Sequence, residues 1–122
     1  MTIEENYFFD TYAIMEIIGG SKNYAPYVSA GVITTKLNLF ELYYSLLKMY
    51  GKERAIYYLK QYAQFVVNFN EDDIQAAADL KISNKALSMT DCIGYMVSLR
   101  KGLKFLTGDK EFENTPNAEF VK

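Results

Sequence analysis

The chain has 122 residues and a mass of 14.0 kDa, with 13 basic and 15 acidic residues and a formal net charge of −2. This length suits one domain spanning residues 1–122, and the content of 50% hydrophobic and 23% charged residues excludes a disordered chain. The sequence has no histidine and one cysteine. These counts exclude Ser-His-Asp and Cys-His catalytic groups, zinc sites built from Cys and His, and a disulfide within the chain. Hydrolytic chemistry would have to rest on carboxylates, hydroxyls, lysine or a bound cofactor.

The sequence also predicts where the protein resides. No segment is long and apolar enough to span a membrane, and the acidic start of the chain lacks the basic region of a secretory signal. Together with the single cysteine, these features predict a cytoplasmic protein that does not associate with membranes.

Hydrophobic periodicity and breaker residues divide the chain into alternating strands and helices. Strands are predicted at 7–9, 32–35, 65–69, 103–106 and 118–121, with helices at 12–18, 39–50, 52–64, 70–81 and from Ser88 or Thr90 to Gly102, and a loop at 22–31. This alternation predicts an α/β fold in which helices cover both faces of a short central parallel sheet, a three-layer, Rossmann-like α/β/α arrangement. In such sheets, ligands bind at the carboxyl ends of the strands, where the strand order reverses.

Four acids occupy positions that this rule singles out. Asp10 follows the first strand and Asp109 follows the strand at 103–106, whereas Glu41 and Asp91 lie in the first turns of helices that start near Asn38 and Ser88. We therefore expect the four carboxylates to converge at one edge of the sheet. Such a cluster requires a cation, because like charges at close range repel, and all-oxygen ligands favour Mg²⁺ or Mn²⁺.

Each acid also has a purely structural interpretation. Asn38 with Glu41, and Ser88 with Asp91, have the spacing of a capping box, and Asp10 has the position of an N-cap. On a helical wheel Glu41 lies opposite the apolar face, as a solvated residue does. The four acids are hard to dismiss together, because all of them fall at strand ends or helix starts.

The motifs that contain these acids resemble those of PIN domains, and in particular of the VapC-type toxin ribonucleases of prokaryotic toxin–antitoxin pairs. The resemblance covers nearly the whole chain, and order, spacing and total length together carry it. The matching motifs are Tyr7-Phe8-Phe9-Asp10-Thr11-Tyr12-Ala13, Asn38-Leu39-Phe40-Glu41-Leu42, Thr90-Asp91 and Leu106-Thr107-Gly108-Asp109-Lys110-Glu111-Phe112.

The resemblance implies a metal site and an enzymatic activity. It implies that Asp10, Glu41, Asp91 and Asp109 are both the metal ligands and the catalytic residues, that Thr107 supports the first aspartate, and that one or two Mg²⁺ or Mn²⁺ ions bind there. The implied reaction is metal-assisted hydrolysis of RNA phosphodiester bonds by an endoribonuclease. Further implications are an antitoxin that covers the acidic groove and a homodimer.

An RNA substrate requires basic side chains that meet phosphates. The candidates fall around the middle helices and near the strand at 103–106, although solvated helix faces are the commoner explanation for such residues. They are Lys48, Lys52, Arg54, Arg100, Lys104 and Lys110.

Two other functions compete with the nuclease. The first is a PIN-like module that binds RNA or protein without catalysis. The second is a phosphotransfer domain with Asp10 or Asp109 as phospho-acceptor, which is disfavoured because Asp10-Thr11-Tyr12 lacks the second aspartate of a D-x-D loop.

Overall fold

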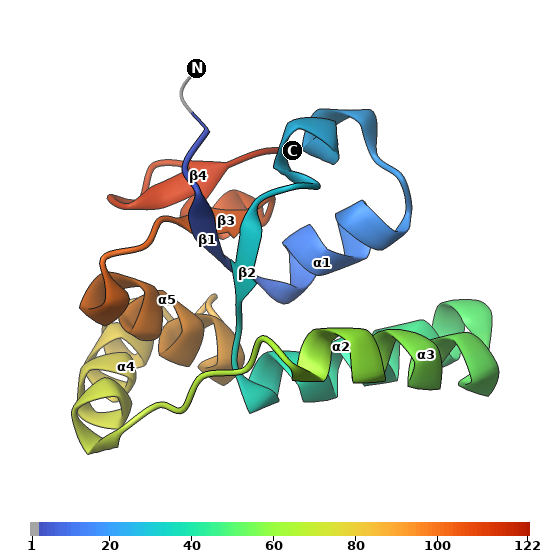
Figure 1. The fold of residues 1–122 in the computed structure, drawn as a ribbon. Helices are drawn as coiled ribbons and strands as arrows, with labels where there is room; N and C mark the ends of the chain where they lie inside the picture. Colours follow the sequence, from blue (N-terminus) through green and yellow to red (C-terminus); the bar gives the residue numbers. More distant parts are fainter. Residues whose placement is uncertain (1–2) are drawn as a thin grey trace.

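The computed structural model describes residues 3–122, which form a four-stranded, all-parallel sheet with helices on both faces (Figure 1). The strand order is β2-β1-β3-β4. The elements in chain order are β1 (Asn6–Phe9), α1 (Thr11–Ile18), the 3₁₀ helix η1 (Lys22–Tyr27), β2 (Gly31–Ile33), α2 (Lys36–Tyr50), α3 (Lys52–Ala63), α4 (Glu71–Ser83), α5 (Met89–Lys101), β3 (Phe105–Thr107), the 3₁₀ helix η2 (Lys110–Phe112) and β4 (Ala118–Phe120). The predicted three-layer α/β/α fold is confirmed.

The central strand β1 divides the hydrophobic core in two, because its side chains alternate between the faces of the sheet. Tyr7 and Phe9 pack in the cluster that includes buried residues of α1, α2 and α3. Phe8 faces the cluster formed with α4 and α5 and stacks on Phe105 of β3, with 5.5 Å between ring centroids. Tyr7, Phe8 and Phe9 are therefore buried on both faces of the sheet, which explains the unbroken aromatic run.

Helix α5 lies unusually close to the sheet at Gly94. A Cβ atom at this position would lie 2.9 Å from Cε1 of Phe8 and 3.3 Å from Cε1 of Phe105. The absence of a side chain therefore lets the helix contact the two stacked rings directly.

The strand order reverses next to β1, which has β2 on one side and β3 on the other. β1 pairs in parallel with β3, with Phe9 opposite Leu106. Continuing this register by one residue brings Asp10 beside Thr107 at the carboxyl edge of the sheet. The fold therefore places these two residues where open parallel sheets bind ligands.

Three local predictions are wrong. The segment 22–31 is not simply a loop, because it contains η1, and 65–69 is not a strand, because only Val66 forms an isolated bridge, to Thr34. Helix α2 begins at Lys36 with Thr35 as its N-cap, so Asn38 does not start it. Within residues 3–122, no helix is long and apolar enough to cross a bilayer.

Candidate active site

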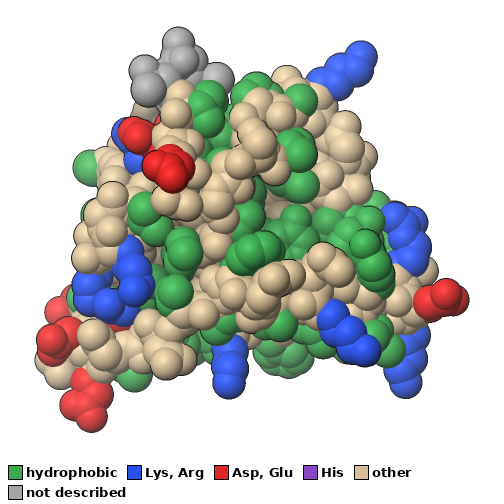
Figure 2. All heavy atoms as spheres, in the orientation of Figure 1, with side chains coloured by type: hydrophobic (Ala, Val, Ile, Leu, Met, Phe, Trp, Pro, Cys, Tyr) green, Lys and Arg blue, Asp and Glu red, His purple; other side chains and the backbone are tan. Residues whose placement is uncertain are grey.

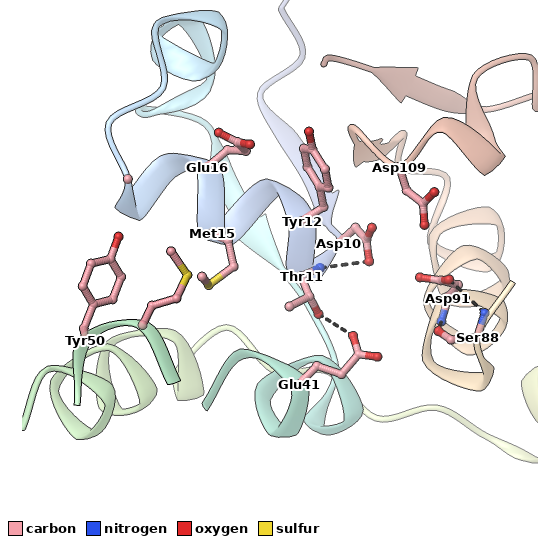
Figure 3. A pocket seen from close by; sticks show the side chains of 12 residues that line it. Asp10, Thr11, Tyr12, Met15, Glu16, Glu41, Tyr50, Ser88, Asp91 and Asp109 are labelled. Carbon is pink, nitrogen blue, oxygen red and sulfur yellow. Dashed lines mark hydrogen bonds between the residues drawn. The ribbon is translucent and has the colours of Figure 1, made fainter. Parts of the chain in front are cut away.

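A cavity of about 580 Å³ opens at the carboxyl edge of the sheet, between α1, α2, α5 and the loop after β3 (Figure 3). All four predicted acids line it. The lining residues are Asp10, Thr11, Tyr12, Met15, Glu16, Gly19, Glu41, Met49, Tyr50, Ser88, Asp91 and Asp109. Within the described chain, therefore, this lining contains five acids and no lysine or arginine.

Asp10 is held rigidly at the end of β1, where only 3% of its surface is exposed. It is the N-cap of α1, and its Oδ1 accepts a hydrogen bond of 2.9 Å from the backbone N–H of Thr11. The Thr107 hydroxyl donates to the other oxygen, Oδ2, at 2.7 Å. Thr107 thus supports the first aspartate, at the place where strand register brings the two residues together.

Glu41 is fixed from α1, although it belongs to α2. The Thr11 hydroxyl lies 2.9 Å from Oε1 of Glu41, and the side-chain amide of buried Asn38 donates to the same hydroxyl at 3.1 Å. The capping interpretation of Asn38 and Glu41 is wrong, because Thr35 caps α2 and Glu41 lies in its second turn. The helical-wheel interpretation is also wrong, because it considered α2 without the neighbouring helix α1.

Asp91 has both a structural and a candidate functional position. The predicted capping box is present: Ser88 Oγ accepts from the N–H of Asp91 at 3.0 Å, and Asp91 Oδ2 accepts from the N–H of Ser88 at 2.9 Å. The Lys81 ammonium donates to the carbonyl of Leu87 at 2.6 Å, which holds the segment just before this helix start. Because a carboxylate has about four acceptor sites, the cap leaves Asp91 able to bind a ligand in the cavity.

Asp109 enters the cavity from the turn after β3. Its Oδ1 accepts from the N–H of Glu111 at 3.0 Å and caps η2, while its own N–H donates to Thr107 Oγ1 at 3.1 Å. Gly108 is required in this turn, because a Cβ atom there would overlap the Tyr12 ring and the carbonyl of Val121.

The acids that line the cavity have no lysine or arginine beside them in the described lining, and this affects their pKa values. Burial, and then the charge of Asp91, raise the pKa of Asp10 to about 8. Burial also raises the pKa of Glu41 and of Asp91, against the hydrogen bonds from Thr11 and Ser88 that favour their ionised forms. Strongly shifted carboxyl groups in a cleft are a recognised mark of functional sites.

The donor chemistry of this lining fits a hard divalent cation, since it offers carboxylate oxygens and, among the described residues, no lysine or arginine that would compete for them. Between residues 3 and 122, however, no three Asp, Glu or Cys side chains lie close enough together to form a preassembled metal-binding group. This spacing is consistent with carboxylates that repel one another.

The six predicted RNA-binding residues are not brought together. Arg100 forms an ion pair with Asp73, and Lys104 precedes β3 at the opposite end of the sheet from the acids. Lys and Arg side chains gather instead over the α2–α3 hairpin, at the right and lower edge of Figure 2. Lys48 lies over the ring of Tyr44, Arg54 lies over Tyr50, Lys52 begins α3, and Lys110 follows Asp109.

Sequence reasoning missed Glu16, Met15 and Tyr50 as cavity residues. Glu16 and Met15 lie one turn after Thr11 and Tyr12 on the same face of α1, so the 3.6-residue period could have indicated them once Asp10 was recognised as the cap. Nothing in the local sequence signals Tyr50, because its position depends on how α2 packs against α1.

The fold and cavity define a three-layer α/β/α protein with an acidic pocket at the switch point of its parallel sheet. The model of the PIN domain family matches residues 7–118, and the chain belongs to that family. The structure is similar to the VapC20 toxin of Mycobacterium tuberculosis, described as cleaving the sarcin-ricin loop, with a TM-score of 0.77 and 18% identity over 96% of this chain and 100% of that one.

Two further solved structures share the fold. A chain of a toxin–antitoxin complex from Klebsiella pneumoniae matches with a TM-score of 0.72 and 19% identity, over 93% of this chain and 95% of that one. VapBC2 from Rickettsia felis, bound to a DNA fragment from its promoter, matches with a TM-score of 0.69 and 17% identity, over 92% of this chain and 94% of that one. A search of curated proteins returns no significant match.

Proposed function

We propose that this PIN domain is a Mg²⁺- or Mn²⁺-dependent endoribonuclease and the toxin of a type II toxin–antitoxin pair, acting on RNA in the cytoplasm. One observation carries the proposal: Asp10, Glu41, Asp91 and Asp109, far apart in sequence, line one cavity whose lining has no basic side chain among the described residues. The fold shared with VapC toxins supports it.

Each acid has a distinct role in this proposal. Asp10 and Asp91 would hold the cation, since both are fixed at helix starts by backbone hydrogen bonds. Glu41 and Asp109 complete the ligand set, and the raised pKa of Glu41 suits it to take a proton from the attacking water. Thr107 orients Asp10.

The cation, when bound, supplies a Lewis acid for the scissile phosphate and lowers the pKa of a water molecule. The carboxylates contribute the charge that retains it. The lining residues that the structure describes include no lysine or arginine, so basic side chains outside the lining, such as Lys52 and Lys110, are the proposed contacts for the flanking phosphates.

The test is cleavage of a labelled RNA by the purified, antitoxin-free protein with Mn²⁺, with EDTA, and with Mn²⁺ after the substitution Asp10→Asn. Asn preserves the N-cap of α1, so the variant is expected to fold. We expect cleavage in the first reaction alone. Undiminished cleavage by the EDTA-treated protein or by Asp10→Asn would exclude the proposed site.

One observation favours a second candidate, a PIN-like module that binds RNA or protein without catalysis. It is the absence, across residues 3–122, of a preassembled group of three metal ligands. The two candidates differ in metal binding, because a ligand that binds only the folded state raises the melting temperature. A Mn²⁺ titration that leaves the melting temperature unchanged, with Asp10→Asn as matched control, would support the non-catalytic module.

An antitoxin is the proposed protein partner. The acidic cavity would attract a partner segment that carries lysine or arginine, which would neutralise the carboxylates and block the substrate. A neighbouring reading frame for a small DNA-binding protein with a polar tail would support this pairing. Co-purification of its product with the wild type, and loss of RNA cleavage in the complex, are the expected results.

A second copy of the chain is the other proposed partner, through the apolar hollow of about 320 Å³ between α4 and α5. Ile74 and Ile82 are exposed along α4, which begins with Glu71 and Asp72 and is followed by Lys85. Antiparallel pairing of α4 with its copy would therefore set opposite charges together. Light scattering should report a dimer that Ile82→Glu converts to a monomer and that the exposed control Val28→Glu leaves intact.

A further inference from the structure

The cavity has a second end that differs in character from the acidic one. Figure 3 shows Tyr50 at the opposite side of the cavity from Asp91, with Met15 between them. Tyr50 and Met15 are uncharged, as are the lining residues Gly19 and Met49, whereas Glu16 lies beside Met15 on α1. The metal chemistry proposed for the acids makes no use of these side chains.

The Tyr50 ring is held in place by the junction of two helices. Tyr50 is the last residue of α2, and Gly51, with φ of 87°, turns the chain directly into α3. One turn later Arg54 returns over the ring, with its guanidinium carbon 4.1 Å from the Tyr50 centroid. The same carbon lies 5.9 Å from the Tyr58 centroid, so two rings attract this cation.

We propose that the Tyr50 end of the cavity is a nucleobase subsite, in which an unpaired base of the substrate contacts the Tyr50 ring and the thioethers of Met15 and Met49, while Arg54 binds an adjacent phosphate. The inference rests on the proposed nuclease function and names its substrate class as single-stranded RNA. A base inside a duplex has no free face to offer an aromatic ring, whereas a loop or single strand does.

Two features of the structure support a role beyond packing. Tyr50 is only half-buried although it contacts the core, so part of its surface lines the cavity. Arg54 is exposed and places a positive charge beside a cavity whose lining, as far as the chain is described, has none. Aromatic side chains with nearby arginines are the usual means of binding single strands.

Helix α2 offers a matched control. Tyr44 is 58% exposed, and Lys48 lies over its ring at 4.8 Å, so this residue also forms a cation–π pair. Tyr44 is not among the residues that line the cavity. A general effect of removing an exposed tyrosine from α2 would affect both positions, whereas a subsite affects only Tyr50.

The experiment measures binding of a ten-nucleotide single-stranded RNA that contains 2-aminopurine, whose fluorescence is quenched on stacking, in the cleavage-silent Asp10→Asn background without added metal. We expect quenching, and roughly tenfold weaker binding for Tyr50→Leu, since base–aromatic stacking is worth about 1–3 kcal/mol. Tyr50→Phe and Tyr44→Leu should bind within about twofold of the parent protein. Arg54→Gln should reduce the slope of log affinity against log salt by about 0.7.

Equal binding and quenching by Tyr50→Leu and the parent protein would overturn the subsite, as would absence of any binding. Circular dichroism verifies folding. If Tyr50→Leu unfolds, Arg54→Gln keeps the test decisive, because an unchanged salt slope would contradict the proposed phosphate contact of Arg54. Cleavage of RNA by the wild-type protein with Mn²⁺ tests the proposed nuclease function separately. If the wild type cleaves RNA but binding does not depend on Tyr50, the nuclease function is supported and the subsite is excluded. If binding depends on Tyr50 but the wild type does not cleave RNA, the subsite is supported and the nuclease function is excluded.

Discussion

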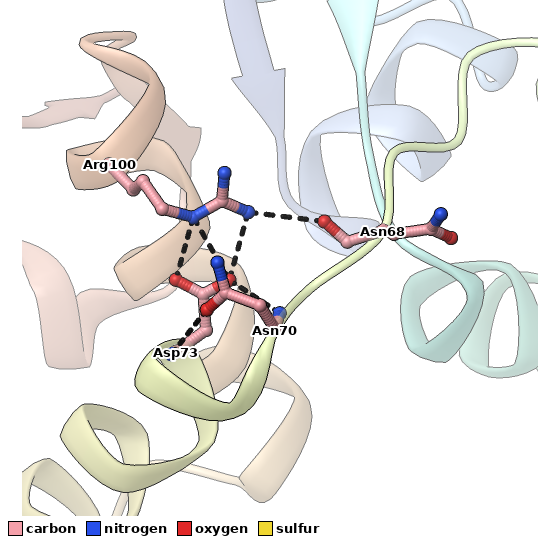
Figure 4. Close-up of polar contacts among 4 residues, drawn as sticks. All are labelled: Asn68, Asn70, Asp73 and Arg100. Atoms are coloured by element: carbon pink, nitrogen blue, oxygen red, sulfur yellow. Dashed lines mark hydrogen bonds and ion pairs between the residues drawn. The ribbon is translucent and has the colours of Figure 1, made fainter.

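Asp10 and Asp73 are equally buried, each with 3% of its surface exposed, but they have opposite electrostatic surroundings. Arg100 meets Asp73 with a forked contact, Nε to Oδ1 at 3.0 Å and Nη2 to Oδ2 at 2.9 Å (Figure 4). Hydrogen bonds from this guanidinium lower the pKa of Asp73, although burial opposes them. The donors that Asp10 has within the described part of the chain, Thr11 and Thr107, are both neutral, and its charged neighbours are Asp91 and Glu41.

The difference separates a carboxylate that stabilises the fold from one that is available for chemistry. Asp73 closes a capping box with Asn70 and ties α4 to α5 through Arg100. Asp10 also caps a helix, but among residues 3–122 no lysine or arginine lines the cavity that it faces. A buried carboxylate without a cationic partner is stabilised by a bound metal ion, whereas a carboxylate that is already paired with an arginine has no need of one.

The largest expected contrast is in activity. Asp10→Asn should lower RNA cleavage with Mn²⁺ by at least about 100-fold, since even residues that only support metal ligands contribute 10- to 100-fold. Asp73→Ala should leave cleavage within about twofold, because Asp73 does not line the cavity. Steady-state cleavage of the same labelled RNA by both variants measures the contrast, and equal losses would remove the distinction between the two aspartates.

The hydroxyl that supports Asp10 gives the next effect. Thr107→Val keeps the buried shape and removes the hydrogen bond of 2.7 Å to Oδ2. We expect cleavage to fall about tenfold, with a higher concentration of Mn²⁺ needed for half-maximal rate. Thr107→Ser, which retains the hydroxyl, should recover most of the activity; failure of Ser to do so would assign the loss to packing.

The stability contrast has the opposite direction. Asp73→Ala removes a capping-box partner of α4 as well as the contact with Arg100, and should lower the melting temperature by about 5 °C, as expected for roughly 1 kcal/mol in a domain of this size. Asp10→Asn in EDTA at pH 7.5 should raise the melting temperature, because the folded wild type must hold on Asp10 a proton that the unfolded chain releases at this pH, and Asn carries no such cost. Differential scanning calorimetry of both variants tests the two signs.

The smallest effect is a pH dependence of the metal-free protein. The pKa of Asp10 is about 8 in the folded state and ordinary in the unfolded state, so the folded protein retains a proton that the unfolded chain releases. Stability from this group is therefore full below pH 4 and decreases as pH rises toward 8. Asp73, with its lowered pKa, contributes in the opposite sense and loses its stabilisation as pH falls below about 4.

Melting curves in EDTA between pH 5 and 8.5 measure this dependence. The wild type should lose melting temperature across the range, and Asp10→Asn should lose less. A parallel decline in both proteins would show that other groups cause it.

The sequence predicts the layers of this fold better than its segment ends. The aromatic run at Tyr7–Phe9 and the alternation of strands with helices indicate the parallel sheet, and glycines at 51 and 102 end helices as predicted. The run at 65–69 is misleading, because apolar residues can cover helices without joining a ladder, and only Val66 forms a bridge.

The site shows the same division. Asp10 and Asp109 follow from strand ends, which are local features. The placement of Glu41 depends on the contact between its helix and Thr11, and that of Tyr50 on the packing of α2 against α1, neither of which local periodicity contains. Packing between helices determines which other side chains line the cavity. The sequence pattern therefore predicts the four acids but not the Tyr50 end of the cavity.

The dual use of Asp10 and Asp109 as N-caps and cavity residues has a consequence for how this chain can change over generations. A single nucleotide substitution converts an Asp codon to an Asn codon, and Asn caps a helix as well as Asp does. One point mutation can therefore remove the proposed chemistry while the helices still start in the same places. Lineages that lose the activity in this way would keep a folded domain with its cavity and its surfaces, and that domain could still act as a binding protein.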